Sequence, residues 1–270
     1  MRTVKLNNGV EMPVIGFGSC RMHKEECVNA VLQAIEAGYR LIDTAIMYGN
    51  EKEVGEAVRK SGIDRKELFI TTKLDNSCAS YIKAKNAIDN CLAVMELEYI
   101  DMIMVHEPYP GWEGMYEAVV EAYKEGKIRA VGISNFFYRN YDHLLQKYDF
   151  VPQVNQIESH VFYPQLELKN YMMEHGTVVQ AWAPLANGQN NIFTNPVLVR
   201  IGEAHNKTAA QTALKYLLQN GITIIPKSSS PVRMKQNLDL DDFELTAEEM
   251  KEIDALDTGS TLYPWTEMWL

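Results

Sequence analysis

The stretch "LIDTAIMYGNE" (41–51) begins as a buried strand and continues with side chains that a strand does not need. Two apolar residues that favour a strand lead into Asp43, a carboxylate. Tyr48 follows five positions later, and residues 49–51 open a helical pattern. A carboxylate at the end of a buried strand, with a phenol on the loop beside it, indicates a functional site.

Short apolar runs of this kind recur along the chain, and each is followed by a helical pattern. Between the first two runs, apolar residues at 28, 31, 32 and 35 fall at helical spacing, and Gly38 stands where a C-terminal cap belongs. We therefore predict eight strand–helix units. The runs span residues 14–17, 41–43, 68–73, 100–106, 128–134, 153–158, 178–183 and 222–227.

The order of these elements predicts an α/β fold. Continuously apolar strands that alternate with helices are typical of a parallel sheet covered on its outer face. The count of eight, without a GxGxxG motif at the first strand–helix turn, favours a closed (β/α)8 barrel over an open sheet. We expect one domain over residues 1–270, with an N-terminal hairpin that turns at residues 7–9 and closes the bottom of the barrel.

Composition narrows the classes of partner. The net charge of -10 argues against a general nucleic-acid or anionic-membrane surface. No apolar run approaches the roughly 18 residues of a membrane span, and the polar start "MRTVKLNNG" is not typical of a signal peptide. The four cysteines form no CxxC pair and suggest neither a disulfide framework nor a metal site. We expect a cytoplasmic, monomeric protein that acts on a small molecule.

Ionisable residues stand where three neighbouring strands end. Asp43 ends the second strand, Lys73 the third and His106 the fourth, while Tyr48 lies on the loop after the second. In a (β/α)8 barrel these positions meet at the C-terminal mouth. Each residue alone is compatible with an ordinary structural role, but four that converge on one mouth indicate a catalytic site.

The chemistry of this set predicts general-acid catalysis. A phenol with a pKa near 10 is a poor acid at neutral pH, and an adjacent ammonium group lowers that pKa. We expect Asp43 to hold Lys73, Lys73 to activate Tyr48, and a neutral His106 to orient a carbonyl oxygen that Tyr48 protonates. Such a reduction needs a hydride donor, which side chains do not supply.

A second set of residues predicts a site for that donor. The fifth and sixth strands end with hydroxyl and amide groups suited to hold a carboxamide, and the seventh ends with a flat aromatic face. The stretch "IPKSSSPVRMKQN" (225–237) is basic in an otherwise acidic chain, and barrels often bind phosphate there. Alone, the basic stretch is equally consistent with a solvated helix start. The residues are Ser134, Asn135, Gln156, Trp182, Lys227, Ser228, Arg233 and Lys235.

Three stretches together resemble the aldo-keto reductase family: "GYRLIDTAIMYGNEKEVGEAV" (38–58), "ITTKL" (70–74) and "IPKSSSPVRMKQN" (225–237). The resemblance runs over nearly the whole chain and implies a (β/α)8 barrel that binds NADPH without a Rossmann domain. It implies that the catalytic residues are Asp43, Tyr48, Lys73 and His106. It also implies that Ser134, Asn135 and Gln156 hold the carboxamide, that Trp182 stacks on the nicotinamide, that Lys227, Ser228 and Arg233 meet the 2′-phosphate, and that Gln236 and Asn237 complete the cofactor site.

Several positions depart from the family pattern. Cys20 stands where many members have an aromatic pocket wall, and Glu107 follows the histidine where "HWP" is usual. Trp182 replaces a tyrosine, and Gln236 replaces a glutamate whose hydrogen bond its amide oxygen can still accept. We assign Cys20 and Glu107 to the substrate pocket and expect Glu107 to disfavour acidic substrates. The short tail (259–270) can close only part of that pocket.

Two other functions fit part of the pattern. A class I aldolase would use Lys73 as a Schiff-base amine, but Tyr48 and Trp182 would then have no role. A protein that binds NADPH as a sensor without turnover would not need the intact catalytic four, although the altered pocket wall is compatible with it.

Overall fold

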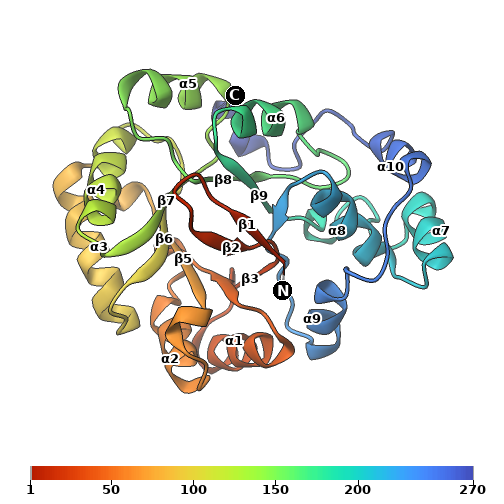
Figure 1. The fold of residues 1–270 in the computed structure, drawn as a ribbon, viewed down its shortest axis with the longest axis horizontal. Coiled ribbons are helices and arrows are strands. Elements are labelled where there is room, and N and C mark those ends of the chain that lie inside the picture. Colours follow the sequence, from red (N-terminus) through yellow and green to blue (C-terminus); the bar gives the residue numbers. More distant parts are fainter. Residues whose placement is uncertain (1, 270) are drawn as a thin grey trace.

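Eight parallel strands form the centre of the molecule in a computed structural model, which describes residues 2–269 (Figure 1). Each strand pairs with its neighbour in chain order, from β3 to β10. A parallel bridge between Ile15 and Ile224 joins the two ends of the sheet, so the predicted barrel is confirmed. The strands are β3 (Gly16–Gly18), β4 (Leu41–Asp43), β5 (Phe69–Leu74), β6 (Ile100–Val105), β7 (Ile128–Ser134), β8 (Val154–Glu158), β9 (Val178–Trp182) and β10 (Thr223–Ile224).

Ten α-helices in the described chain surround the barrel. In the first of them the expected apolar stripe is buried except for Leu32, which is partly buried, and Gly38 ends the helix with φ 114° and an N–H that donates to the carbonyls of Ala34 and Ile35. Two helices, not one, lie between β9 and β10. The helices are α1 (Lys24–Ala37), α2 (Glu51–Lys60), α3 (Tyr81–Met95), α4 (Trp112–Lys124), α5 (Tyr138–Lys147), α6 (Leu166–Glu174), α7 (Pro196–Ala204), α8 (Ala209–Gln219), α9 (Pro231–Leu238) and α10 (Ala247–Asp254).

The strands differ from the predicted runs mainly at their ends. The eighth run was expected over 222–227, but β10 has only two residues, and the backbone beyond it passes through Pro226, which has no N–H to donate. The first strand begins at Gly16 rather than at residue 14. The other six lie within one residue of the predicted runs.

Side chains that alternate along the strands fill the barrel interior. Leu41 and Met104 belong to one buried apolar cluster inside the barrel. Because alternate residues of a strand share a face, Asp43 and His106, two positions further on, are directed to the same interior at its C-terminal end. The same period leads from Phe69 to Lys73, from Ala130 to Ser134, from Val154 to Gln156 and from Val178 to Trp182.

The N-terminal hairpin crosses the opposite end of the barrel (Figure 1). Strands β1 (Thr3–Lys5) and β2 (Glu11–Pro13) pair antiparallel, and Gly9 takes a left-handed φ of 87° in the turn. Asn8 donates from Nδ2 to the carbonyl of Arg129 at 2.9 Å, which ties the turn to β7. The predicted closure of the barrel bottom is confirmed.

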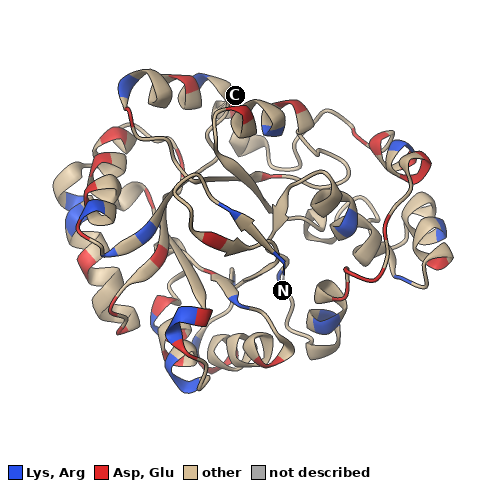
Figure 2. Ribbon diagram, viewed as in Figure 1, with Lys and Arg blue, Asp and Glu red and all other residues tan. Residues whose placement is uncertain are grey.

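Charged residues of both signs are interspersed over the outer helices (Figure 2). One ionic cluster lies near the bottom of the barrel, where buried Asp101 forms salt bridges with Arg65 and Arg129, each at 2.7 Å. This cluster holds strand starts together and lies far from the mouth. Within residues 2–269, no helix has the length and apolarity needed to cross a membrane.

Candidate active site

A buried ion pair lies under the C-terminal mouth of the barrel. Lys73 Nζ is 2.6 Å from Asp43 Oδ1 and also donates to the carbonyl of Thr44 at 2.8 Å. Both side chains are essentially inaccessible to solvent. A buried charge is tolerated only when it is paired and hydrogen-bonded, so each of these residues requires the other.

Tyr48 lies directly above this pair. It ends the short 3-10 helix η1 (Ile46–Tyr48), and its ring centroid is 5.1 Å from Lys73 Nζ. The His106 ring faces it edge-on, with 6.0 Å between ring centroids. The loop is fixed from behind by buried Asn50, whose amide donates to the carbonyls of Ser19 and Met22 at 2.9 Å. The structure therefore brings the four predicted catalytic residues together.

The pKa of Tyr48 differs from the expectation based on sequence. Burial raises this pKa well above its ordinary value, and the negative charge of Asp43 adds to the rise. The expectation of a lowered pKa is wrong, because burial and Asp43 outweigh the stabilisation that the Lys73 ammonium group, itself engaged by Asp43 and the Thr44 carbonyl, gives to the phenolate. Tyr48 thus holds its proton at neutral pH and is present in the donor form.

His106 is neutral over the physiological range. Burial, with a contribution from the Lys73 charge, lowers its pKa to about 3. Its Nδ1 atom is buried and has no hydrogen-bond partner in the part of the chain that the structure describes. These surroundings favour the neutral imidazole that the sequence predicted.

Gln156 occupies a position that the sequence did not reveal. Its Nε2 donates to Asp43 Oδ2 at 2.9 Å and to Gln180 Oε1 at 2.8 Å. The residue expected to hold a carboxamide is therefore bonded to the carboxylate under Tyr48. Gln180 was missed, although a glutamine inside the apolar run of β9 is the same kind of signal that identified Lys73 in β5.

Asn135 connects the histidine to the aromatic face at the end of β9. It has a left-handed φ of 59°, which asparagine tolerates better than most residues. Its Nδ2 donates to the carbonyl of His106 at 3.3 Å, and its Oδ1 accepts from Trp182 Nε1 at 2.9 Å. This pair of bonds fixes the indole at the mouth.

One cavity of about 1240 Å³ contains almost the whole predicted site. Every predicted site residue except Lys73 and Lys235 lines it. It extends from Tyr48 and His106 to Lys227 and Arg233 at the start of α9, where the Ser230 hydroxyl caps the helix. Both proposed pocket residues, Cys20 and Glu107, belong to this lining.

The C-terminal tail covers the mouth and is anchored by a residue that the sequence reading missed. Glu158, at the end of β8, is fully buried and accepts from the Leu262 N–H at 2.9 Å and from the Thr261 hydroxyl. Its Oε1 is also 2.9 Å from His160 Nε2. A carboxylate at a strand end could have been noticed, as Asp43 was, but its partner lies more than 100 residues away.

The tail carries aromatic rings onto the cavity wall. Within the 3-10 helix η5 (Pro264–Trp269), Trp265 stacks on Trp182 with 5.9 Å between centroids and an interplanar angle of 11°. Tyr263 meets the same indole edge-on at 4.8 Å. One face of Trp182 is thus occupied by the tail.

The family model described as Aldo/keto reductase family matches residues 14–258. The chain belongs to this family. It is 41% identical over 266 residues to the glyoxal reductase of Bacillus subtilis (strain 168), covering 97% of this chain and 95% of that protein. It is 40% identical to the morphine 6-dehydrogenase of Pseudomonas putida, covering 97% and 93%. The crystal structure of an aldo-keto reductase from a Medee basin deep-sea metagenome library superposes with a TM-score of 0.94 at 40% identity, covering 96% and 97%.

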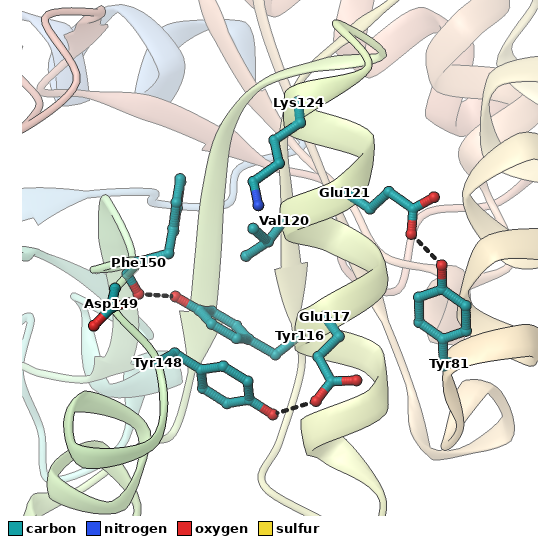
Figure 3. A pocket seen from close by; sticks show the side chains of 9 residues that line it. All are labelled: Tyr81, Tyr116, Glu117, Val120, Glu121, Lys124, Tyr148, Asp149 and Phe150. Atoms are coloured by element: carbon teal, nitrogen blue, oxygen red, sulfur yellow. Dashed lines mark hydrogen bonds between the residues drawn. The ribbon is translucent and has the colours of Figure 1, made fainter.

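A second cavity, of about 540 Å³, lies on the outside of this aldo-keto reductase beside α4 (Figure 3). Its polar groups bond to one another: the Tyr116 hydroxyl donates to the Phe150 carbonyl at 2.6 Å and the Tyr148 hydroxyl to Glu117 at 2.8 Å. We assign it no ligand. Across the described residues, no group of three His, Cys, Asp or Glu side chains is placed to hold a metal ion.

Proposed function

We propose that this aldo-keto reductase reduces an aldehyde or ketone to an alcohol with NADPH, and that Tyr48 is the general acid. The observation that supports the proposal is the convergence of Tyr48, Lys73, Asp43 and His106 at the end of one large cavity. A protonated phenol, a neutral imidazole and a paired ammonium group are the parts that such a reduction needs.

In this proposal the chain's own residues handle the oxygen of the carbonyl group. Bound NADPH would supply a hydride to the carbonyl carbon, and Tyr48 would give its proton to the carbonyl oxygen. The Lys73 charge beneath the ring stabilises the phenolate that forms as the proton leaves, and Asp43 keeps Lys73 charged and in place. Neutral His106 positions the oxygen by a hydrogen bond and does not compete as an acid, because its pKa is about 3.

The residues along the cavity fit a nicotinamide dinucleotide. The volume exceeds the roughly 300–1,000 Å³ usual for a small-molecule pocket, which leaves room for a cofactor and a substrate. Ser134 and Asn135 offer polar groups near the catalytic end. Lys227 and Arg233 provide positive charge at the other end, beside the start of α9, where phosphate binding is favourable. We propose that Ser228, Gln236 and Asn237 contribute there.

Two of the relatives suggest a small substrate. One is named a glyoxal reductase and another, from Escherichia coli (strain K12), a methylglyoxal reductase, so small neutral carbonyl compounds are the first candidates. The exposed apolar rim, formed by Met47, Phe193 and Trp265, also admits an apolar substituent. A cytoplasmic location and a monomeric state remain predictions.

The test is consumption of NADPH by the purified enzyme with a panel of aldehydes, ketones and keto sugars, combined with quenching of tryptophan fluorescence by NADPH. We expect both. Quenching without turnover on any carbonyl compound would favour a sensor. Trapping of a substrate on Lys73 by borohydride would favour an aldolase, which the engagement of Lys73 Nζ by Asp43 argues against.

A further inference from the structure

Glu107 belongs to the wall of the substrate end of the cavity. It follows His106 beyond the end of β6, and both residues line the cavity. In a strand, neighbouring residues face opposite ways, but β6 ends at Val105 and Glu107 stands in a bend, so alternation does not fix its direction. The Glu107 side chain is 7% exposed.

This carboxyl group lacks a partner. Among residues 2–269 it accepts no hydrogen bond and forms no salt bridge, and its Oε2 atom is fully buried. Unpartnered buried polar groups are rare in folded proteins and cost free energy, more so when they are charged. An apolar residue at this position would pack without that cost, so packing does not explain the glutamate.

The charges around Glu107 are negative. Burial raises its pKa, and the nearby carboxylate of Asp75, on the loop after β5, adds to the rise. Glu107 in turn contributes to the raised pKa of Tyr48, so the negative charge of Glu107 acts at the reacting end of the cavity. Lys73, the buried cation of the site, is already paired with Asp43. The other cavity cations, Arg21, Lys227 and Arg233, form no ion pair with Glu107, and neither does His23.

We infer that Glu107 is a specificity-determining residue, whose carboxyl group attracts carbonyl substrates that carry a protonated amine and repels those that carry a carboxylate. The inference rests on the proposed function, because it concerns the substrate of the same site. A bound ammonium group supplies the partner that the carboxyl group lacks. The removal of Glu107's charge therefore changes the order of substrates and leaves the chemistry of reduction in place.

The experiment compares three para-substituted benzaldehydes of similar size. One carries a dimethylaminomethyl group, protonated at neutral pH, one a neutral isopropyl group and one a carboxylate. We measure kcat/KM for the native enzyme, for Glu107→Gln and for Glu98→Gln. The last variant removes the same charge from the exposed turn before β6, at the opposite end of the strand.

In the native enzyme we expect the cation to exceed the anion in kcat/KM by about 10-fold, from charges roughly 6 Å apart near a wet mouth. Glu107→Gln should reduce this ratio by about 5-fold or more, with the neutral substrate changed by less than about 2-fold. Glu98→Gln should leave the ratio unchanged, and added salt should shrink it only where Glu107 is present. Thermal unfolding should show Glu107→Gln at least as stable as the native enzyme.

An unchanged ratio in Glu107→Gln would overturn the inference and leave the reductase proposal intact. If no aldehyde is reduced, the reductase proposal fails, and calorimetric binding of the three corresponding benzyl alcohols decides the inference by itself. Native binding in the order cation, neutral, anion, lost in Glu107→Gln, would support it. Equal affinities in both proteins would overturn it.

Discussion

Asp43 Oδ2 accepts a hydrogen bond from Gln156 Nε2 at 2.9 Å, while Oδ1 of the same carboxylate accepts from Lys73 at 2.6 Å. One buried carboxylate thus joins the lysine beneath Tyr48 to a residue that we place in the cofactor site. Because both of its oxygens are engaged, Asp43 can neither rotate nor be lost without disturbing both groups. We therefore expect both the stability of the barrel and the activity of the site to depend on Asp43.

Loss of Lys73 alone should be strongly destabilising. Lys73→Met leaves Asp43 buried without its cation, and we expect the free energy of unfolding to fall by about 3–5 kcal/mol. The double variant Asp43→Asn with Lys73→Met should recover part of this loss, because the unpaired charge is gone. Urea unfolding of the native protein, of Lys73→Met and of the double variant measures these free energies. Lys85→Met is the control, since it breaks the surface pair with Glu121 and should cost only about 0–1 kcal/mol. Equal losses of stability in Lys73→Met and Lys85→Met would show that burial of the pair between Lys73 and Asp43 is energetically unimportant.

Proton donation should depend on a single hydroxyl group. Tyr48→Phe should lower kcat by at least about 100-fold, the low end for a lost general acid, while the Kd for NADPH stays near the native value. Tyr109→Phe removes another hydroxyl from the wall of the same cavity and should have little effect on kcat. Steady-state kinetics and fluorescence titration measure both quantities. Substantial turnover in Tyr48→Phe would remove this residue from the role.

The preference for NADPH should rest on Arg233. Its guanidinium group can form a forked, charge-assisted pair with a phosphate, which a ribose hydroxyl does not match. Arg233→Ala should weaken NADPH by about 1.5–3 kcal/mol, or roughly 10- to 150-fold, and affect NADH much less. Lys235→Ala is the control, because Lys235 lies on the same helix but not on the cavity wall. Equal losses for both cofactors would show that Arg233 contacts something other than the 2′-phosphate.

Buried His106 should make stability depend on pH. Its pKa is about 3 in the folded protein and about 6.5 when unfolded, so the unfolded chain binds more protons between these values. Stability is therefore lost as the pH falls from about 6.5 towards 3, by at most about 1.4 kcal/mol per pH unit from this residue. His106→Asn should make that slope shallower in denaturant titrations between about pH 4 and 7. His23→Asn, which removes an exposed imidazole, is the control. Identical slopes for native and His106→Asn proteins would contradict a neutral buried imidazole.

The tail should need Glu158 to cover the mouth. Glu158→Ala removes the acceptor for the Leu262 N–H and the Thr261 hydroxyl, so the rings of Tyr263 and Trp265 lose their anchor. We expect KM for the carbonyl substrate to rise several-fold with a smaller change in kcat, and proteolysis near residues 258–262 to become faster. Glu267→Gln is the control: it changes an exposed carboxylate of the tail and should neither raise KM nor speed proteolysis. An unchanged rate of proteolysis would show that other contacts hold the tail.

Local pattern in the sequence was sufficient for the fold and for most members of the site. Eight apolar runs at nearly regular spacing predicted the barrel, and the alternation of side chains along each strand directed Asp43, Lys73, His106, Ser134, Gln156 and Trp182 towards its interior. These features depend on residues two to four positions apart, which is the range over which sequence periodicity carries information. The ends of the strands were less well predicted, as the two-residue β10 shows.

Contacts between distant segments decided the remaining features. The bond from Gln156 to Asp43 spans 113 residues and the bond from Leu262 to Glu158 spans 104, and no local pattern encodes either pairing. The pKa of Tyr48 rises because the assembled mouth buries the phenol, an effect that the order of the residues does not contain. Glu107 stands two residues past the end of β6, where alternation no longer fixes direction, so only the folded chain determined that this residue lines the cavity.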